Sequence, residues 1–213
     1  LPSVADVTWH DLRPVPTALV TGSNGKTTTV RLIAACAQAQ GWRAGYTCTD
    51  GVFVAGTMLE SGDYSGPAGA RRVLRDERVE AAVLETARGG ILRRGLAVSR
   101  ADVAVVTNVS ADHFGEYGIH DLDALADVKL TVGAVVSPDG MLVLNADDTT
   151  LRAKSAGLAS RFGHRPPLAW FAADADDPHL LSHRASGGST CGVRAGHLVL
   201  AHGGAEHDLG EIA

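Results

Sequence analysis

The sequence predicts an α/β domain with a mostly parallel β-sheet and helices on both faces. From Thr17 to about Phe171, short apolar and β-branched runs alternate with helical patterns, as in consecutive β-α-β units. The run at 103–106, Val-Ala-Val-Val, is apolar without alternation, as expected of a strand covered on both faces. The predicted strands lie at residues 18–21, 44–49, 81–84, 103–106, 141–144 and 168–171.

Three helices have boundary signals in the sequence. The first covers about residues 28–40, directly after the first strand and a glycine-rich loop. Ser65 and Pro67 predict the N-cap and an early position of a second helix, which ends near residue 75. Asp121 caps a third, which runs to about residue 136 before a Pro-Asp-Gly turn at 138–140.

The C-terminal part of the chain has a different character. Residues 183–189 are polar and glycine-rich, and two short strands at 191–194 and 197–201 predict a β-hairpin around Ala195 and Gly196. We therefore expect a lead-in segment at 1–16, a P-loop α/β domain at 17–180 and a β-rich extension of the same domain at 181–213. A doubly wound domain that ends on a hairpin suggests that more protein follows.

Composition restricts the classes of partner. With 45% apolar and 20% charged residues among 213, the chain has the balance of a globular domain. Its net charge of −5 argues against general nucleic-acid binding, and no apolar run approaches the ~18 residues of a membrane helix. The three scattered cysteines and the absence of signal-peptide features indicate a cytoplasmic location. The sequence leaves a homo-oligomer open.

A glycine loop at residues 22–27 predicts phosphate binding. It links the first strand to the first helix, where glycines let backbone N–H groups close around phosphate oxygens and the helix N-terminus adds positive charge. Lys26 would reach the β- and γ-phosphates, and the Thr27 hydroxyl would hold Mg²⁺. The plainer alternative is a glycine turn with a surface lysine. The expected nucleotide-binding residues are Gly22, Ser23, Asn24, Gly25, Lys26, Thr27 and Thr28.

Polar residues gather at the predicted carboxyl ends of the strands, where open α/β sheets bind ligands. Glu85, at the end of one strand, is a candidate Mg²⁺ ligand; the alternative is a helix-capping acid or one paired with Arg88. His113 is a candidate for a metal or phosphate contact, or else a hydrogen-bonded structural histidine. Others at this edge are Thr49, Asp50, Thr107, Asn108, Asp112, Asn145, Asp147 and Asp148.

Lys129 falls in the middle of the apolar face of the third predicted helix. Lysines are rarely buried unless paired. Burial favours the neutral amine, which can react with CO₂ to give a carbamate able to bridge metal ions. The alternative is a lysine whose stem packs while its ammonium reaches solvent.

Several segments together resemble the Mur ligase superfamily of ATP-dependent amide ligases. The glycine loop has two residues between its glycines rather than four, a shortened spacing that this superfamily shares. The similarity covers about residues 16–213 and is greatest to the Mur-ligase-like module of the cyanophycin synthetases. The segments that carry it are 21–29, 49–51, 62–67, 84–96, 106–113 and 144–148.

The resemblance implies the central ATP-binding domain of a carboxylate–amine ligase that works through an acyl phosphate. It implies ATP and Mg²⁺ as cofactors and a carboxylate and an amino-acid amine as substrates. Lys26 would stabilise the transferring phosphate, and Thr27 and Glu85 would hold Mg²⁺. His113 would occupy the second metal position, and Lys129 matches a lysine that is carbamylated in several members.

The same resemblance points to a substrate side of the site. Asp50, Asp63, Arg88 and Arg93 are the candidates, and the basic run that includes Arg94 would suit an anionic substrate. A solvated helix face is the alternative for Arg93 and Arg94.

The ATP-grasp module of the cyanophycin synthetases and the family's adenine-contacting segment and amine-binding C-terminal domain are not found in these residues. We therefore expect weak ATP binding and no complete ligase turnover from this stretch alone. A small-molecule kinase or ATPase and a non-catalytic nucleotide-binding domain are the alternatives.

Overall fold

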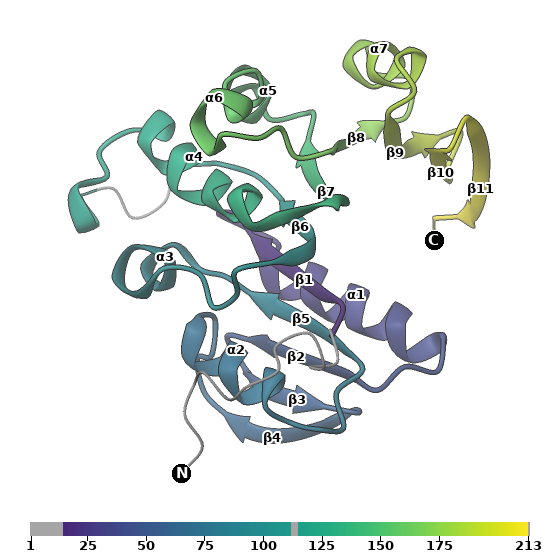
Figure 1. Cartoon of the computed structure of the whole chain (residues 1–213). Coiled ribbons are helices and arrows are strands. Elements are labelled where there is room, and N and C mark those ends of the chain that lie inside the picture. Colours follow the sequence, from purple (N-terminus) through teal and green to yellow (C-terminus); the bar gives the residue numbers. More distant parts are fainter. Residues whose placement is uncertain (1–14, 112–114, 213) are drawn as a thin grey trace.

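The computed structural model describes residues 15–111 and 115–212 (Figure 1). The strands are β1 (Thr17–Thr21), β2 (Ala44–Cys48), β3 (Gly51–Val54), β4 (Thr57–Ser61), β5 (Ala81–Glu85), β6 (Ala101–Val106), β7 (Val136–Asn145), β8 (Leu168–Asp174), β9 (Ser189–Arg194), β10 (His197–His202) and β11 (Ala205–Glu211). The helices are α1 (Lys26–Ala39), α2 (Pro67–Leu74), α3 (Arg88–Arg94), α4 (Leu122–Leu130), α5 (Thr149–Ser155), α6 (Leu158–Phe162) and α7 (Pro178–Ala185), with 3-10 turns η3 (Glu116–Gly118) and η4 (Thr131–Val135).

The strands form one mixed sheet that is parallel in its centre. Its order is β11-β10-β9-β8-β7-β6-β1-β5-β2-β3-β4. All pairings from β2 to β9 across the centre are parallel, and antiparallel strands flank them at both edges. The predicted fold class is therefore confirmed, and the carboxyl ends of the central strands lie at one edge.

Successive side chains of the central strands pack into two apolar cores, one on each face of the sheet. Leu19 of β1 packs into the larger core with α2, α3 and α4, whereas its neighbour Val20 packs with Val30 and Ala34 of α1. Figure 1 accordingly shows α1 on the opposite side of the sheet from α2 and α3. Successive side chains of a strand point to opposite faces, so a strand buried on both sides has to be apolar throughout.

Two predicted boundary features differ in the structure. The N-cap of α2 is Gly66 rather than Ser65, because the Ser65 hydroxyl donates instead to Asp63 Oδ1 at 2.6 Å. The predicted turn at 138–140 lies inside β7, where the register against β6 shifts. Gly140 approaches the Asp102 carbonyl closely there: a Cβ would lie 2.4 Å from that oxygen.

The predicted helix cap at Asp121 and the predicted C-terminal hairpin are confirmed, and the structure contains three strands that were not predicted. Asp121 caps α4, since its Oδ1 accepts a hydrogen bond from Ala124 N at 2.7 Å. The predicted hairpin is present as β9 and β10, with Ala195 and Gly196 at φ values of 50° and 81°. Strands β3, β4 and β11 were not expected, and α7 crosses the expected boundary at residue 180. Across the part of the chain described here, no helix has the length and apolar character to cross a membrane.

Candidate nucleotide and metal site

The glycine loop lies between the carboxyl end of β1 and the start of α1. Gly25 is the N-cap of α1 with φ 79°, a left-handed conformation that glycine adopts without strain. No side chain caps this helix end, so its first N–H groups remain available. Gly22 is needed for a different reason: a Cβ there would lie 1.9 Å from Thr107 Oγ1. The loop is therefore seated directly against the end of β6.

Side chains that follow β6 hold the backbone of this short loop. Thr107 Oγ1 donates to Asn24 O at 2.5 Å, and Asn108 Nδ2 donates to the same oxygen at 3.1 Å. Asn24 N donates to Asn108 Oδ1 at 3.0 Å. Ser23 Oγ donates to Ser110 O and accepts from Ser110 N, both at 3.0 Å. These contacts fix a loop that has two residues between its glycines.

Lys26 folds over the loop that precedes it. Its Nζ donates to Gly22 O at 3.0 Å and to Ser23 O at 2.9 Å. These two carbonyls place a positive charge at the mouth of the loop. Thr28, in the same first turn of α1, is exposed.

Glu85 and Thr27 meet beside the loop. Thr27 Oγ1 donates to Glu85 Oε2 at 2.7 Å and lies 3.2 Å from Thr49 Oγ1. Glu85 is the last residue of β5 and only 1% exposed, and its Oε1 has no hydrogen-bond partner among the described residues. A buried carboxylate oxygen without a partner is costly unless a ligand satisfies it. Together with the hydroxyl of Thr27, it forms a donor set that fits a hard divalent cation.

The electrostatic surroundings of Glu85 have opposing effects. Burial raises the pKa of Glu85 above its ordinary value, and the hydrogen bond from Thr27, the ammonium of Lys26 and the backbone N–H of Thr49 partly oppose that rise. The negative charge of Asp63 raises the pKa further. A cation at this position would remove the unfavourable effect of burial.

Of the other two predicted metal ligands, Lys129 lies among the described residues and His113 does not. Lys129 is 2% exposed and lies on α4 with the buried Leu125, Ala126 and Leu130, which favours the buried lysine over one whose ammonium reaches solvent. His113 and Asp112 lie outside the described residues. Within residues 15–111 and 115–212, no three His, Cys, Asp or Glu side chains group as a metal cluster.

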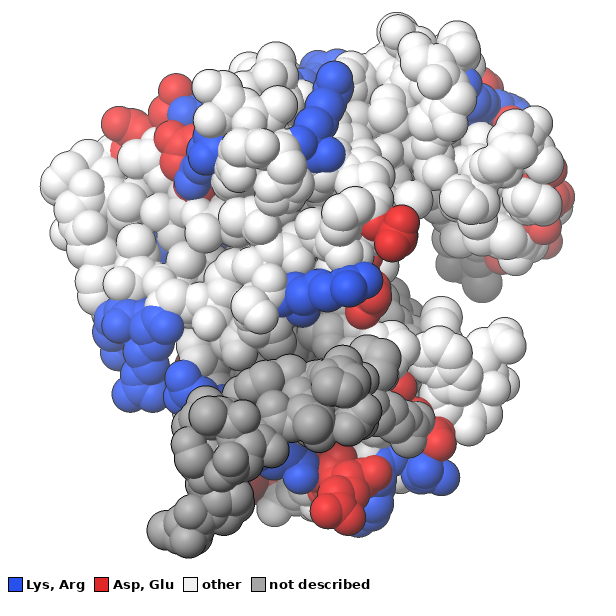
Figure 2. Space-filling model, in the orientation of Figure 1, with Lys and Arg blue, Asp and Glu red and all other residues white. Residues whose placement is uncertain are grey.

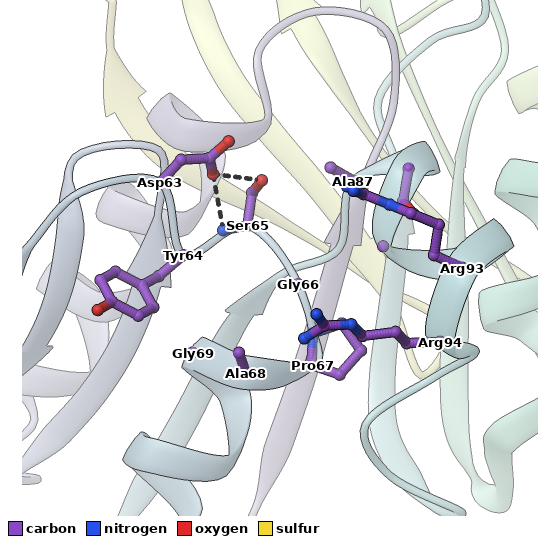
Figure 3. A pocket seen from close by; sticks show the side chains of 12 residues that line it. Asp63, Tyr64, Ser65, Gly66, Pro67, Ala68, Gly69, Ala87, Arg93 and Arg94 are labelled. Atoms are coloured by element: carbon purple, nitrogen blue, oxygen red, sulfur yellow. Dashed lines mark hydrogen bonds between the residues drawn. The ribbon is translucent and has the colours of Figure 1, made fainter. Parts of the chain in front are cut away.

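The predicted substrate residues fall in two places. Asp50 forms an ion pair with Arg31 at 2.6 Å, on the turn between β2 and β3. Asp63 and Arg93, by contrast, line one cavity of about 350 Å³ (Figure 3), and Arg88 begins the adjacent helix α3. The cavity lies between residues 63–69, Ala87, Gly89, Gly90, Arg93 and Arg94.

The sequence predicted that the loop and Glu85 lie at the same edge of the sheet, but not which residues hydrogen-bond to the loop and hold it in place. Thr107, Asn108 and Ser110 do so, together with Asn145, whose Nδ2 donates to Thr107 O at 2.9 Å. The available signal was their position directly after two predicted strands at the ligand-binding edge.

Strand, glycine loop and helix at the centre of a parallel sheet define the class of α/β domains with a phosphate-binding loop. Within that class, the chain belongs to the Mur ligase middle domain family, whose model matches residues 20–179. The resemblance inferred from the sequence is thereby confirmed.

Curated relatives include cyanophycin synthetases. That of Trichormus variabilis is 42% identical over 195 residues, which are 92% of this chain and 21% of the relative. That of Synechocystis is 41% identical over 189 residues, which are 89% of this chain and 21% of the relative. The chain thus spans about a fifth of these relatives.

Solved structures share the fold. A UDP-N-acetylmuramoyl-L-alanyl-D-glutamate–2,6-diaminopimelate ligase superimposes with a TM-score of 0.70 at 20% identity, covering 93% of this chain and 39% of that one. A bifunctional folylpolyglutamate synthase/dihydrofolate synthase with Mn, AMPPNP and L-glutamate bound gives 0.62 at 20% identity, covering 92% and 49%. At this identity the likeness establishes the fold alone.

Proposed function

We propose that this chain is the ATP-binding domain of an ATP-dependent carboxylate–amine ligase. The observation that carries the proposal is the buried Glu85, which accepts a hydrogen bond from Thr27 of the glycine loop and whose Oε1 has no partner within residues 15–111 and 115–212. Family membership supports the same class, because the matching family is a Mur ligase domain and the curated relatives are synthetases by name. Kinase or simple ATPase chemistry on the same loop is the alternative.

The reaction has two steps. A substrate carboxylate oxygen attacks the γ-phosphorus of ATP and ADP leaves, giving an acyl phosphate. The amine then attacks the acyl carbon, loses a proton and expels phosphate, giving an amide. Such chemistry depends on positioning and on neutralising phosphoryl charge. Lys26 and the loop amides from Gly22 to Thr27 are suited to that role.

The proposed metal is Mg²⁺. Thr27 and Glu85 would hold it, and His113 and Lys129 would serve a second position. The bound ion would neutralise charge on the phosphate oxygens. A solved synthase of this fold has Mn and AMPPNP bound, which supports a divalent cation together with a nucleotide.

We propose that Lys129 carries a carbamate. Its ε-amine would attack the carbon of CO₂ and lose a proton, leaving an anion. The 2% exposure of Lys129 supports this, because a buried, neutral amine is the reactive form. Mass measurement under non-acidic conditions should detect a labile CO₂ adduct that Lys129→Arg lacks, and equal masses after allowing for the substitution would contradict it.

The whole protein's partners follow as part of the same proposal. Residues 1–213 would bind ATP and position the carboxylate, and a further domain would bind the amino-acid amine. A cytoplasmic setting supplies ATP and suits three cysteines that form no disulfide among the described residues.

Amine dependence tests the proposal. In the full-length protein, phosphate release from ATP should require both carboxylate and amine, and Lys26→Ala should abolish it. Phosphate release that is independent of amine, with no amide formed, would favour a kinase or ATPase instead.

A further inference from the structure

A second cavity lies at the edge of the sheet opposite the glycine loop. Its volume is about 370 Å³, which is sufficient for a small molecule, and its walls include residues at or just before the starts of β6, β7 and β8. These strands are parallel neighbours, so their amino ends meet at one edge. Strand β6 alone has six residues at about 3.3 Å each, which places the cavity on the order of 20 Å from the nucleotide site. A ligand in it would therefore be separate from the reacting groups.

One side of this cavity is apolar and also carries a hydroxyl. Val135, Val136 and Pro138 line it, from η4 and the start of β7. Val136 is 3% exposed and belongs to the larger core, so this side is held in place by packing. Ser137 is 5% exposed, and its Oγ makes no hydrogen bond within the described residues. A mostly buried hydroxyl without a partner is available to donate to a ligand.

Two arginines supply positive charge to the same cavity. Arg100 precedes β6 and Arg165 precedes β8, and both side chains are exposed. Neither forms an ion pair or a hydrogen bond with another residue in the described part of the chain. Asp102, two residues from Arg100, accepts a hydrogen bond from Thr17 N at 2.8 Å. None of the described residues that line the cavity is an Asp or Glu, so both guanidinium groups are available to an anion.

A neighbouring hollow just before β5 shows what distinguishes this cavity. Arg75 lines that hollow together with Asp76 and Glu77, so an anion there would meet two carboxylates. Figure 2 shows Lys and Arg side chains in small separate groups on the visible face rather than as one continuous basic surface. Such a distribution disfavours a polyanion, which needs an extended positive surface. The cavity with Arg100 and Arg165 is therefore suited to a small anion.

We propose that the cavity between residues 99–100, 134–138 and 164–165 binds a small organic anion with an apolar body, such as an aryl-substituted carboxylate. Arg100, Arg165 and the Ser137 hydroxyl donate hydrogen bonds to the anionic group, because a guanidinium fork matches a carboxylate. The apolar body lies against Val135 and Pro138. The site goes beyond the proposed ligase function and does not depend on it, since these residues lie at the other edge of the sheet.

NMR titration of the ¹⁵N-labelled chain with 3-phenylpropionate tests this site. Acetate is the control for the anion alone, and 3-phenyl-1-propanol is the control for the apolar body alone. A carboxylate probe is used because a phosphate would also enter the glycine loop. 3-Phenylpropionate should bind more tightly than either control and shift the amides of Val135, Ser137 and Arg165. The amides of Gly22 and Gly25 in the glycine loop should not shift.

Substitution of the two arginines tests the charged contacts. Arg165→Gln and Arg100→Gln should each weaken binding of 3-phenylpropionate about threefold to fivefold, as expected for an exposed charged contact. The double substitution should weaken it about tenfold or more, and Arg165→Lys should retain part of the affinity. Arg75→Gln is the matched control, because Arg75 is an exposed arginine in the neighbouring hollow. It should bind the probe as the unaltered chain does.

Three results would overturn the proposal. Equal binding of all three probes would mean that the cavity does not recognise an anion with an apolar body. An equal loss of affinity in Arg75→Gln would mean that only the overall charge of the chain matters. Shifts confined to the amides of Gly66 and Gly90 would place the probe in the cavity lined by Asp63 and Arg93 instead.

Discussion

Charged side chains at the centre of the sheet and in its C-terminal strands differ in exposure and in whether they have partners. At the centre, Glu85 is 1% exposed, and its Oε1 has no hydrogen-bond partner in the part of the chain that the structure describes. In β9–β11, Arg194 pairs with Asp176 at 2.7 Å and with Glu206 at 2.6 Å in an exposed network. The exposed pairs satisfy one another, whereas only one of the two oxygens of the buried carboxylate has a hydrogen-bond partner among the described residues. A polar group that folding leaves unsatisfied is where we expect a ligand.

The largest expected effect is that of Gly22→Ala at the central site. The new Cβ would overlap Thr107 Oγ1, and φ of +148° is strained for alanine. We expect a loss of about 2–4 kcal/mol in unfolding free energy, from backbone strain and broken hydrogen bonds. Urea denaturation measures it. Gly41→Ala, with φ +85° and open space around it, is the control and should lose only about 1 kcal/mol. Equal losses would contradict the steric explanation.

The next largest effect should be a loss of ATP affinity in Asn108→Ala. It removes both hydrogen bonds from the Asn108 side chain to the Asn24 backbone. We expect about tenfold weaker ATP binding, because the loop loses its preorganisation. Calorimetric titration with ATP checks this. An unchanged affinity in Asn108→Ala would contradict the bracing role.

Glu85→Gln should change how stability depends on pH. Because the pKa of Glu85 is raised in the folded protein, the folded state holds this proton more tightly than the unfolded chain does. The stability contributed by Glu85 is therefore present below its unfolded pKa and is lost as pH rises through the folded value. The Tm of the variant, relative to the unaltered chain, should therefore rise as the pH increases above the ordinary Glu pKa of about 4.3.

Exposed Glu77 supplies the control for that comparison. Glu77→Gln should show no such trend in thermal denaturation across the same pH range. A parallel trend in both variants would mean that the burial of Glu85 is not its cause.

The smallest effect should come from the C-terminal network. Arg194→Gln breaks the pairs with Asp176 and Glu206, which are solvent-exposed and therefore weak. We expect a slight fall in Tm and no change in ATP affinity. Added salt should make the fall in Tm smaller still, because it screens the exposed ion pairs. A weakened ATP affinity would show that the two regions are coupled.

The apolar pattern was sufficient to predict the central strands but not all of the edge strands. Strands β1, β5 and β6 are buried along most of their length, so their apolar runs are visible in the sequence. Strand β11 is exposed at every position and β4 at all but one, and neither shows the alternation of apolar and polar residues that marks a half-buried strand. Their pairing depends on neighbours that the local sequence does not specify.

The same limit applies to the site. The loop and Glu85 could be predicted because a glycine-lysine motif and a strand-terminal acid have local signatures. Ser65 has the local signature of a cap, yet Asp63 engages its hydroxyl. That Thr107 and Asn108 would brace the loop depended on β6 lying next to β1, which residue spacing does not reveal.

Magnesium dependence of ATP binding, measured by calorimetry on the unaltered chain and on Glu85→Gln, tests the assignment of Glu85 most directly. We predict that Mg²⁺ strengthens ATP binding to the unaltered chain at least about tenfold, through neutralisation of phosphate and carboxylate charge. In Glu85→Gln, binding without Mg²⁺ should persist and the gain from Mg²⁺ should largely disappear. An equal gain in both proteins would contradict the role of Glu85 as a metal ligand.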